Sequence, residues 1–189
     1  SGSTAVCVVL RGDSLYVASV GDSRAVLCAN TRAGRVQPVP LTVDHKPDAP
    51  AERARILAAG GRVLATKNRM HPHLVGPMRV WLKDVPAPGL AMSRAIGDLV
   101  AKTAGVVSTP HRLQRTLKSH HMSLIMASDG LWDFVPNEEV VSVVSKAPDS
   151  RAAAHTLLRT ARSRWLERTG CADDTTILVI SLALGGSSV

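Results

Sequence analysis

The stretch "LIMASDGLWDFV", residues 124–135, leads a run of apolar side chains directly into an acidic turn. Its first four residues have the apolar character of a buried strand, and Gly130 permits a sharp turn immediately after Asp129. We therefore expect the Asp129 carboxylate where a core strand leaves its sheet, with Asp133 four residues further on. Turn chemistry explains any one such acid, because Asp and Gly are ordinary turn residues.

The order of the other elements indicates the fold class. β-prone runs at residues 4–10, 15–20 and 25–29, separated by Gly- and Asp-containing turns, predict an antiparallel meander. Further strands are expected within residues 111–118, 123–130 and 175–184, and helices at residues 49–61, 136–146 and 150–168. Strands, then helices, then a last strand, without βαβ alternation, predict an α+β fold with antiparallel sheets. No linker is visible, so residues 1–189 are expected to form a single domain.

Sequence periodicity assigns the faces of these helices. Gly60 is placed to end the first helix in a left-handed conformation. The second is expected to bury Val140, Val141 and Val144 on one face. The core stripe predicted for the third helix comprises Ala154, Leu157, Leu158, Ala161 and Trp165.

Residues 63–89 lose the periodic pattern and contain several prolines and histidines. A stretch of this length without regular structure is uncommon inside a compact domain unless it has a function. We interpret residues 66–89 as a flap beside a site, which contributes more to substrate selection than to the core.

Composition narrows the function classes. The formal charge is +8, but the basic residues are spread along the chain and aromatic residues make up only 3%, so no nucleic-acid partner is expected. The preferred reading of this charge is a solvated basic face or attraction of acidic or phosphorylated substrates. Cys7, Cys28 and Cys171 show no metal-ligand spacing and suit a reducing compartment, and no apolar run is long enough to span a membrane. An intracellular location, cytoplasmic or nuclear, is expected.

Two further acidic sites border predicted strands. Asp173 and Asp174 precede the last strand, and Asp22 lies in a predicted hairpin turn. Carboxylates without nearby cysteines or paired histidines are the ligands of Mg²⁺ or Mn²⁺. Two such ions about 3.5–4 Å apart suit water attack on a phosphoester. The sequence has no P-loop or nucleophile-elbow motif to suggest a different chemistry, so metal-assisted phosphoester hydrolysis is the interpretation from the residues alone.

Six motifs in one order resemble the metal-dependent type 2C serine/threonine protein phosphatases. They are "SGSTAV", "VGDSRAVL", "DHKPDAPAERARILAAGG", "GLAMSRAIGD", "ASDGLWD" and "GCADDTT", and they cover nearly the whole chain. The resemblance implies a sandwich of two antiparallel β-sheets flanked by α-helices. It also implies two Mn²⁺ or Mg²⁺ ions and direct attack of a metal-bound water on phosphoserine or phosphothreonine in protein substrates.

Carried over by position, the resemblance makes Asp129 and Asp173 metal ligands. Asp22 resembles an acid that supports a third metal, and Asp133 an acid of the second shell or of an extra metal. Asp174 stands where the family usually has Asn, which adds charge beside the second ligand.

No segment matches the family's phosphate-binding Arg, its acidic pair or its D-G-H-G motif, so no catalytic residue is identified in this chain. The sequence is interpreted as a domain without its N-terminal part and is expected to be inactive alone. The alternative is a catalytically incomplete, pseudophosphatase-like binding or regulatory module. His45, His71, His73, His120 and His121 are interpreted as structural or solvated histidines rather than ligands.

Overall fold

The computed structural model describes residues 1–67 and 75–182, and it divides into two compact units. Unit 1 comprises Ser1–Ala5, Ser19–Asp22 and Asp44–His111. Unit 2 comprises Val6–Ala18, Ser23–Val43 and the described chain from Arg112 onward. Each unit has its own core and is described separately below.

Two sheets build unit 2. The three-stranded sheet has the order β10-β3-β2, and the four-stranded sheet has the order β12-β11-β4-β5 with antiparallel neighbours. The strand bounds are β2 Ala5–Arg11, β3 Ser14–Val20, β4 Arg24–Asn30, β5 Val36–Pro40, β10 His111–Thr116, β11 His121–Ala127 and β12 Ile177–Ser181. These bounds confirm all six predicted strand regions and add β5.

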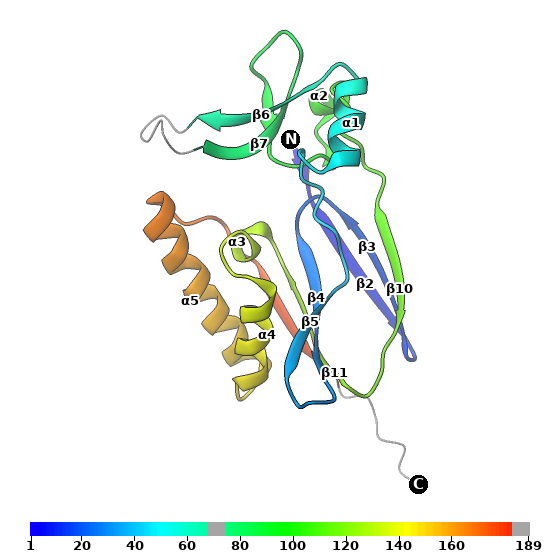
Figure 1. The fold of residues 1–189 in the computed structure, drawn as a ribbon, viewed down its shortest axis with the longest axis vertical. Coiled ribbons are helices and arrows are strands. Elements are labelled where there is room, and N and C mark those ends of the chain that lie inside the picture. Colours follow the sequence, from blue (N-terminus) through cyan, green and yellow to red (C-terminus); the bar gives the residue numbers. More distant parts are fainter. Residues whose placement is uncertain (68–74, 183–189) are drawn as a thin grey trace. The chain divides into compact units, whose positions relative to one another are not determined.

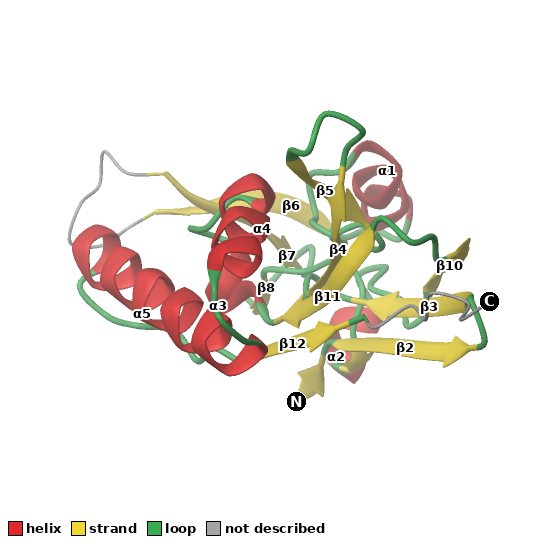
Figure 2. Ribbon diagram, turned by 90° about the horizontal axis from the view of Figure 1, so that it is seen from below, coloured by secondary structure: helices red, strands yellow, loops and turns green. Residues whose placement is uncertain are grey.

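A hydrophobic core lies between the two sheets of unit 2. It joins Leu15 and Val17 of β3 to Leu27 of β4 and Leu124 of β11. The predicted sandwich of antiparallel sheets is therefore confirmed (Figures 1 and 2).

The predicted meander is wrong at its third strand, because β4 leaves the sheet of β3 and pairs with β11 and β5. The cause is visible in β4 itself, whose residues 25–29 are all buried. Such a strand has to lie between two layers: Ala25 and Leu27 face the intersheet core, while Val26 and Cys28 face the helices. The turn that carries Asp22 is consequently a crossing between sheets and not a hairpin.

Helices α3 (Asp129–Trp132), α4 (Asn137–Lys146) and α5 (Ser150–Thr169) lie on one side of the four-stranded sheet (Figure 1). Val140, Val141 and Val144 are buried as predicted. The stripe predicted for α5 is corrected to Ala153, Leu157 and Ala161, while Leu158 is 39% exposed. These residues are four apart in sequence and therefore lie on one face of α5. The predicted stripe included Leu158 because this residue is apolar, although it lies beside that face.

Unit 1 contains two small sheets and two helices. Its elements are β1 (Gly2–Ser3) paired with β9 (Ile96–Gly97), β6 (Arg62–Lys67), β7 (Val75–Trp81) and β8 (Pro88–Leu90) in the order β6-β7-β8, α1 (Pro50–Ala58) and α2 (Leu99–Lys102). Its core comprises Ile56, Val63, Val80, Ala95, Ala101, Ala104 and Val106. The predicted stop of α1 is confirmed: Gly60 has φ +80°, and the N–H groups of Gly60 and Gly61 donate to the carbonyls of Leu57 and Ile56.

The stretch interpreted as an irregular flap, residues 66–89, holds the end of β6, all of β7 and the beginning of β8. Val80 is fully buried in the core of unit 1, and the Arg79 guanidinium donates to the Gly89 carbonyl at 2.8 Å. The prolines and Gly76 hid the strand periodicity here. His71 and His73 lie outside the described residues, and a role of this stretch in substrate selection stays a prediction.

Of the helices within residues 1–67 and 75–182, none combines the length and apolar character that a membrane span needs.

Candidate active site

Two acidic loops meet at one end of the four-stranded sheet. Strands β11 and β12 are antiparallel, and Ala127 at the end of β11 pairs with Ile177 at the start of β12. The chain leaving β11 therefore emerges beside the chain entering β12. This register places the turn of Asp129 next to the loop of Asp173 and Asp174, as their positions at strand ends predicted.

Ser128 binds these two loops together. Its hydroxyl accepts the Thr176 N–H at 3.1 Å and donates to the Asp174 carbonyl at 3.3 Å. Its own N–H donates to the Thr176 carbonyl at 3.1 Å. One side chain thus fixes the spacing between the residue before Asp129 and the loop of the second acid.

Gly130 allows the loops to approach closely. A Cβ at this position would lie 2.5 Å from the Asp174 carbonyl oxygen and 2.5 Å from Thr175 Oγ1. Its backbone lies in the first turn of α3, so the close approach, and not a left-handed conformation, explains the glycine.

The carboxylates differ in burial. Asp129 is half-buried, whereas Asp133, Asp173 and Asp174 are exposed. Asp173 Oδ1 accepts the Asp174 N–H at 2.9 Å, which orients the loop, and the Asp133 N–H donates to the Asp129 carbonyl. Asp133 is the residue directly after α3, which begins with Asp129.

Aromatic residues hold α3 in place. The Trp132 indole donates to the Ala127 carbonyl at 3.0 Å, and the Trp165 indole of α5 donates to the Gly130 carbonyl at 2.7 Å. The Arg24 guanidinium lies 5.1 Å from the centre of the Trp132 ring. Asp129 therefore projects from a turn that is tied to both the strand before it and the helix behind it.

These residues fit a divalent cation in the chemistry of their donors. Carboxylates and nearby carbonyl oxygens are the ligands that Mg²⁺ and Mn²⁺ prefer, and such ions keep several waters. Across the described ranges, however, no three His, Cys, Asp or Glu side chains gather into one metal-ligating cluster. The role of Asp129 and Asp173 as metal ligands therefore stays a prediction.

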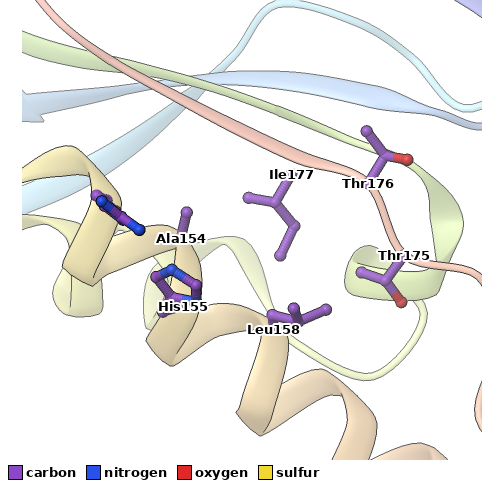
Figure 3. A pocket seen from close by; sticks show the side chains of 7 residues that line it. Ala154, His155, Leu158, Thr175, Thr176 and Ile177 are labelled. Carbon is purple, nitrogen blue, oxygen red and sulfur yellow. The ribbon is translucent and has the colours of Figure 1, made fainter.

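A pocket of about 350 Å³ lies beside the acidic loop of unit 2. Figure 3 shows Ala154, His155 and Leu158 of α5 on one side, and Thr175, Thr176 and Ile177 on the other. Leu158 and Ile177 make the lining partly apolar, and Arg151 adds a positive charge to it. Three of the lining residues, Thr175 to Ile177, directly follow Asp173 and Asp174 in the sequence.

Asp22 belongs to unit 1 and is 1% exposed. Its Oδ2 pairs with Lys46 Nζ at 2.6 Å, while its Oδ1 is buried without a hydrogen-bond partner in the described structure. Buried carboxylate oxygens normally have a partner, so Oδ1 keeps an unused acceptor that a water or a cation would satisfy. The proposed role of Asp22 in holding a third metal stays a prediction.

His45 holds the turn that carries Asp22. Its Nδ1 lies 2.9 Å from the Gly21 carbonyl oxygen and 3.1 Å from the Gly21 nitrogen, and its backbone N–H also donates to that carbonyl. Burial, and then the positive charge of Arg94, lower the pKa of the His45 imidazole. The interpretation of His45 as a structural residue agrees with these contacts.

Glu52 of α1 is the centre of a buried ionic network in unit 1. Its carboxylate binds Arg94, Arg55 and the Ser93 hydroxyl, at 2.6, 2.9 and 2.6 Å respectively. Burial acts to raise the pKa of Glu52, but the hydrogen bonds from Arg94, Arg55 and Ser93 outweigh it and hold the pKa well below its usual range. This network joins the "ERAR" and "SRA" segments of the motifs.

Sequence reasoning missed Ser128 and Lys46. Serine beside an acid is also ordinary turn chemistry, so nothing in the sequence distinguishes a residue that bonds to a loop 48 positions away. Lys46 lies within the quoted motif "DHKP", yet its partner Asp22 is 24 positions earlier.

The fold and this site together define a class: an α+β sandwich whose acidic loops meet at one end of a sheet, with donors suited to a hard divalent cation. The model of the family described as "Protein phosphatase 2C" matches residues 1–169. The chain therefore belongs to the protein phosphatase 2C family, as the resemblance implied.

Plant relatives agree with this assignment. "Probable protein phosphatase 2C 12" of Oryza sativa subsp. japonica is 44% identical over 165 residues, which cover 87% of this chain and 41% of the relative. "Probable protein phosphatase 2C 61" of Arabidopsis thaliana is 41% identical, covering 96% of this chain and 55% of the relative. The chain thus spans about half the length of these curated relatives.

Solved structures share the fold. A serine-threonine phosphatase 2C from Toxoplasma gondii superposes with a TM-score of 0.81 at 28% identity, covering 95% of this chain and 58% of that one. A C. elegans sex determining protein has a TM-score of 0.70 at 24% identity, which shows likeness of fold alone.

Proposed function

We propose that this chain carries part of the active site of a metal-dependent protein serine/threonine phosphatase. The observation that supports the proposal most is the Ser128 bridge, which holds the Asp129 turn against the Asp173 loop at one sheet end. Membership of the protein phosphatase 2C family supports the reaction class.

The acidic side chains of this chain would place negative charge around a divalent cation. Asp129 and Asp173 would hold Mn²⁺ or Mg²⁺, with Asp174 adding negative charge beside the second ligand. When bound, such ions supply Lewis acidity that activates water and neutralises phosphate charge. The tie of α3 to Trp165 keeps Asp129 in place, so little reorganisation is needed when the cation binds.

The proposed substrates are phosphoserine and phosphothreonine in proteins. The net charge of +8 favours encounter with a phosphorylated, acidic segment. Asp133 and Asp22 are proposed to act as supporting acids, for a neighbouring metal or through its bound waters.

Calorimetric titration of the 189-residue chain with Mn²⁺ tests the assignment of Asp129. Asp129→Asn should weaken Mn²⁺ binding by at least about tenfold, since even residues that merely support ligands have effects of this size. Asp13→Asn makes the same charge change at an exposed position of unit 2, whose carbonyl accepts the Leu117 N–H before the start of β11, at the opposite end of that strand from Asp129. Equal affinities of the Asp129→Asn variant and the parent chain would remove Asp129 from the ligand set.

Hydrolysis of a phosphothreonine peptide in millimolar Mn²⁺ tests the activity. We propose that the 189-residue chain turns over far more slowly than a full-length relative such as the rice protein, because it offers no counterpart of the family's phosphate-binding Arg and D-G-H-G motif. Comparable turnover by the two proteins would overturn this expectation and show that other residues of this chain supply those roles.

A further inference from the structure

A second pocket, which is lined by polar residues, lies at the end of the four-stranded sheet opposite the acidic loops. Its volume is about 550 Å³, and it belongs entirely to unit 2. The lining residues come from the end of β4, the turn after it and the start of β5, and from the connection between β10 and β11: Asn30, Thr31, Arg32, Gln37, Lys118 and His120.

Backbone hydrogen bonds join these two turns into one scaffold. The Asn30 N–H donates to the His120 carbonyl at 2.8 Å. Within the first turn, the Thr31 N–H donates to the Arg35 carbonyl, and the Arg35 N–H donates to Thr31 Oγ1. The backbone on both sides of the pocket is therefore fixed, although its charged side chains reach into solvent.

The lining has the chemistry of an oxyanion site. Arg32 and Lys118 are cations, Asn30 and Gln37 carry amide donors, and Thr31 carries a hydroxyl. No Asp or Glu stands among the residues that line it. A guanidinium with neighbouring donors can bind two phosphate oxygens at once, which an isolated surface charge cannot do.

His121 is buried beside the pocket, and its pKa reflects the basic side chains around it. Its Nδ1 accepts the Lys118 N–H at 2.9 Å, so the neutral ring carries its proton on Nε2. Burial lowers the pKa of His121 first, and the positive charges of His120, Arg115 and Lys118 lower it further. The charged side chains that lower the pKa of His121 are thus all basic.

The sheet register separates this pocket from the acidic loops. Ala127 pairs with Arg24 at the acidic end, while His121 pairs with Ala29 at the other. His121 and Ala127 are six residue steps apart along β11, a distance of roughly 20 Å. A ligand in the pocket would therefore not touch Asp129 or Asp173.

We propose that this pocket binds a phosphate group, with Arg32 and Lys118 as its principal charged contacts. The site goes beyond the proposed hydrolytic function, because it needs neither metal nor catalysis. Free inorganic phosphate and the phosphate of a phosphothreonine peptide share this chemistry, and the two sources are distinguished by experiment.

The test is calorimetric titration of the 189-residue chain with inorganic phosphate, a phosphothreonine peptide and the same peptide without phosphate. EDTA is present throughout, so that binding through a metal at Asp129 and Asp173 is removed. The double variant Arg32→Gln/Lys118→Gln should weaken phosphate binding by about tenfold, the loss expected for two exposed charge pairs. The matched control is Arg159→Gln/Arg162→Gln, which removes two exposed charges from α5.

Loss of affinity in the pocket variant with retention in the α5 variant would support the site. Equal binding of free phosphate and phosphopeptide would then identify the phosphate group alone as the ligand, and tighter phosphopeptide binding would identify a protein ligand. Equal weakening by both double variants would show attraction to net charge only and overturn the proposal. Absence of phosphate binding to the parent chain would overturn it as well. Neither result depends on Mn²⁺ binding or turnover, so the proposed function is judged separately.

Discussion

At the scale of single residues, Ser128 controls the spacing of the two acidic loops. Ser128→Ala removes one hydrogen bond from the Thr176 N–H and one to the Asp174 carbonyl. We expect a loss of about 1–2 kcal/mol in the free energy of unfolding and faster hydrogen exchange at the Thr176 amide. Mn²⁺ affinity should fall too, because the Asp173 loop is no longer held beside Asp129.

Ser163→Ala provides the control for Ser128→Ala, since Ser163 bonds only to Glu167 along the exposed face of α5. Denaturant titration and amide exchange should show little change for this variant. Unaltered exchange at Thr176 in Ser128→Ala would mean that the backbone pairing of the two loops suffices without the hydroxyl.

The Asp22–Lys46 pair predicts an asymmetric response to substitution. Lys46→Met leaves a carboxylate that is 1% exposed without its cation, which should cost about 3 kcal/mol of stability. Asp22→Asn leaves a lysine side chain that is 34% exposed and can reach water, so its cost should be near 1 kcal/mol. Thermal denaturation of both variants and of the double variant measures the coupling, and equal costs for the two single variants would contradict the predicted asymmetry.

The positions of Asp129 and Asp173 at strand ends could be predicted from sequence, because apolar runs beside acids reveal where a core strand stops. Their partners could not. Ser128, Lys46 and Gly130 act on residues 24 to 48 positions away, and these pairings depend on strand register that no local pattern specifies.

At the scale of elements, the Glu52 network ties α1 to the segment that holds Ser93 and Arg94. Since the folded-state pKa of Glu52 lies below the ordinary value of 4.5, its ionised form stabilises the folded state at neutral pH. That contribution is complete above the ordinary value and is lost as pH falls from about 4.5 toward the lower folded-state pKa.

Glu52→Gln should therefore cost roughly 2–3 kcal/mol at pH 7 and make the stability of unit 1 less sensitive to acid. Denaturant titration at several pH values between 3 and 7 provides the measurement. Glu138→Gln is the control, because it makes the same substitution at an exposed position at the start of α4. A stability difference between parent and Glu52→Gln that does not narrow below pH 4.5 would contradict the assigned role of the ionised carboxylate.

The packing of α3 leads to a second prediction for an element. Ala normally favours a helix over Gly by about 1 kcal/mol, yet Gly130→Ala should destabilise this protein. The added methyl group would meet the Asp174 carbonyl and the Thr175 hydroxyl, both at 2.5 Å, and push the acidic loop away from α3. Chemical denaturation and Mn²⁺ titration should both show a loss, and a gain in stability would mean that the loop moves at little cost.

Sequence patterns predicted the elements better than their connections. The strands and the two long helices follow from periodicity, and the C-terminus of α1 follows from Gly60. The crossing of β4 into the second sheet was missed because a five-residue apolar run fits any buried strand. Strand β7 was missed because Gly76 and Pro77 interrupt its alternation.

At the scale of the whole molecule, the two units have separate cores, which predicts where core substitutions act. Leu157 is fully buried against β11 and α4 in unit 2, and Val80 is fully buried among Ile56, Val63 and Ala95 in unit 1. Each truncation to Ala removes buried methyl groups, so we expect losses of about 3 kcal/mol for Leu157→Ala and somewhat less for Val80→Ala. Because protection against hydrogen exchange reports regional opening, these losses should appear in different places.

Val80→Ala should accelerate exchange mainly in β6, β7 and α1, and Leu157→Ala mainly in β4, β11 and α5. Native-state exchange followed by mass spectrometry locates both effects in one experiment, with Leu158→Ala as the control because that α5 side chain is 39% exposed. Since β4 has one face in each core of unit 2, Leu157→Ala should also loosen the sheet between α5 and the intersheet core. The acidic end of that sheet would then lose Mn²⁺ affinity in Leu157→Ala but keep it in Val80→Ala. Uniform acceleration by both variants would instead show that the two units open as one cooperative structure.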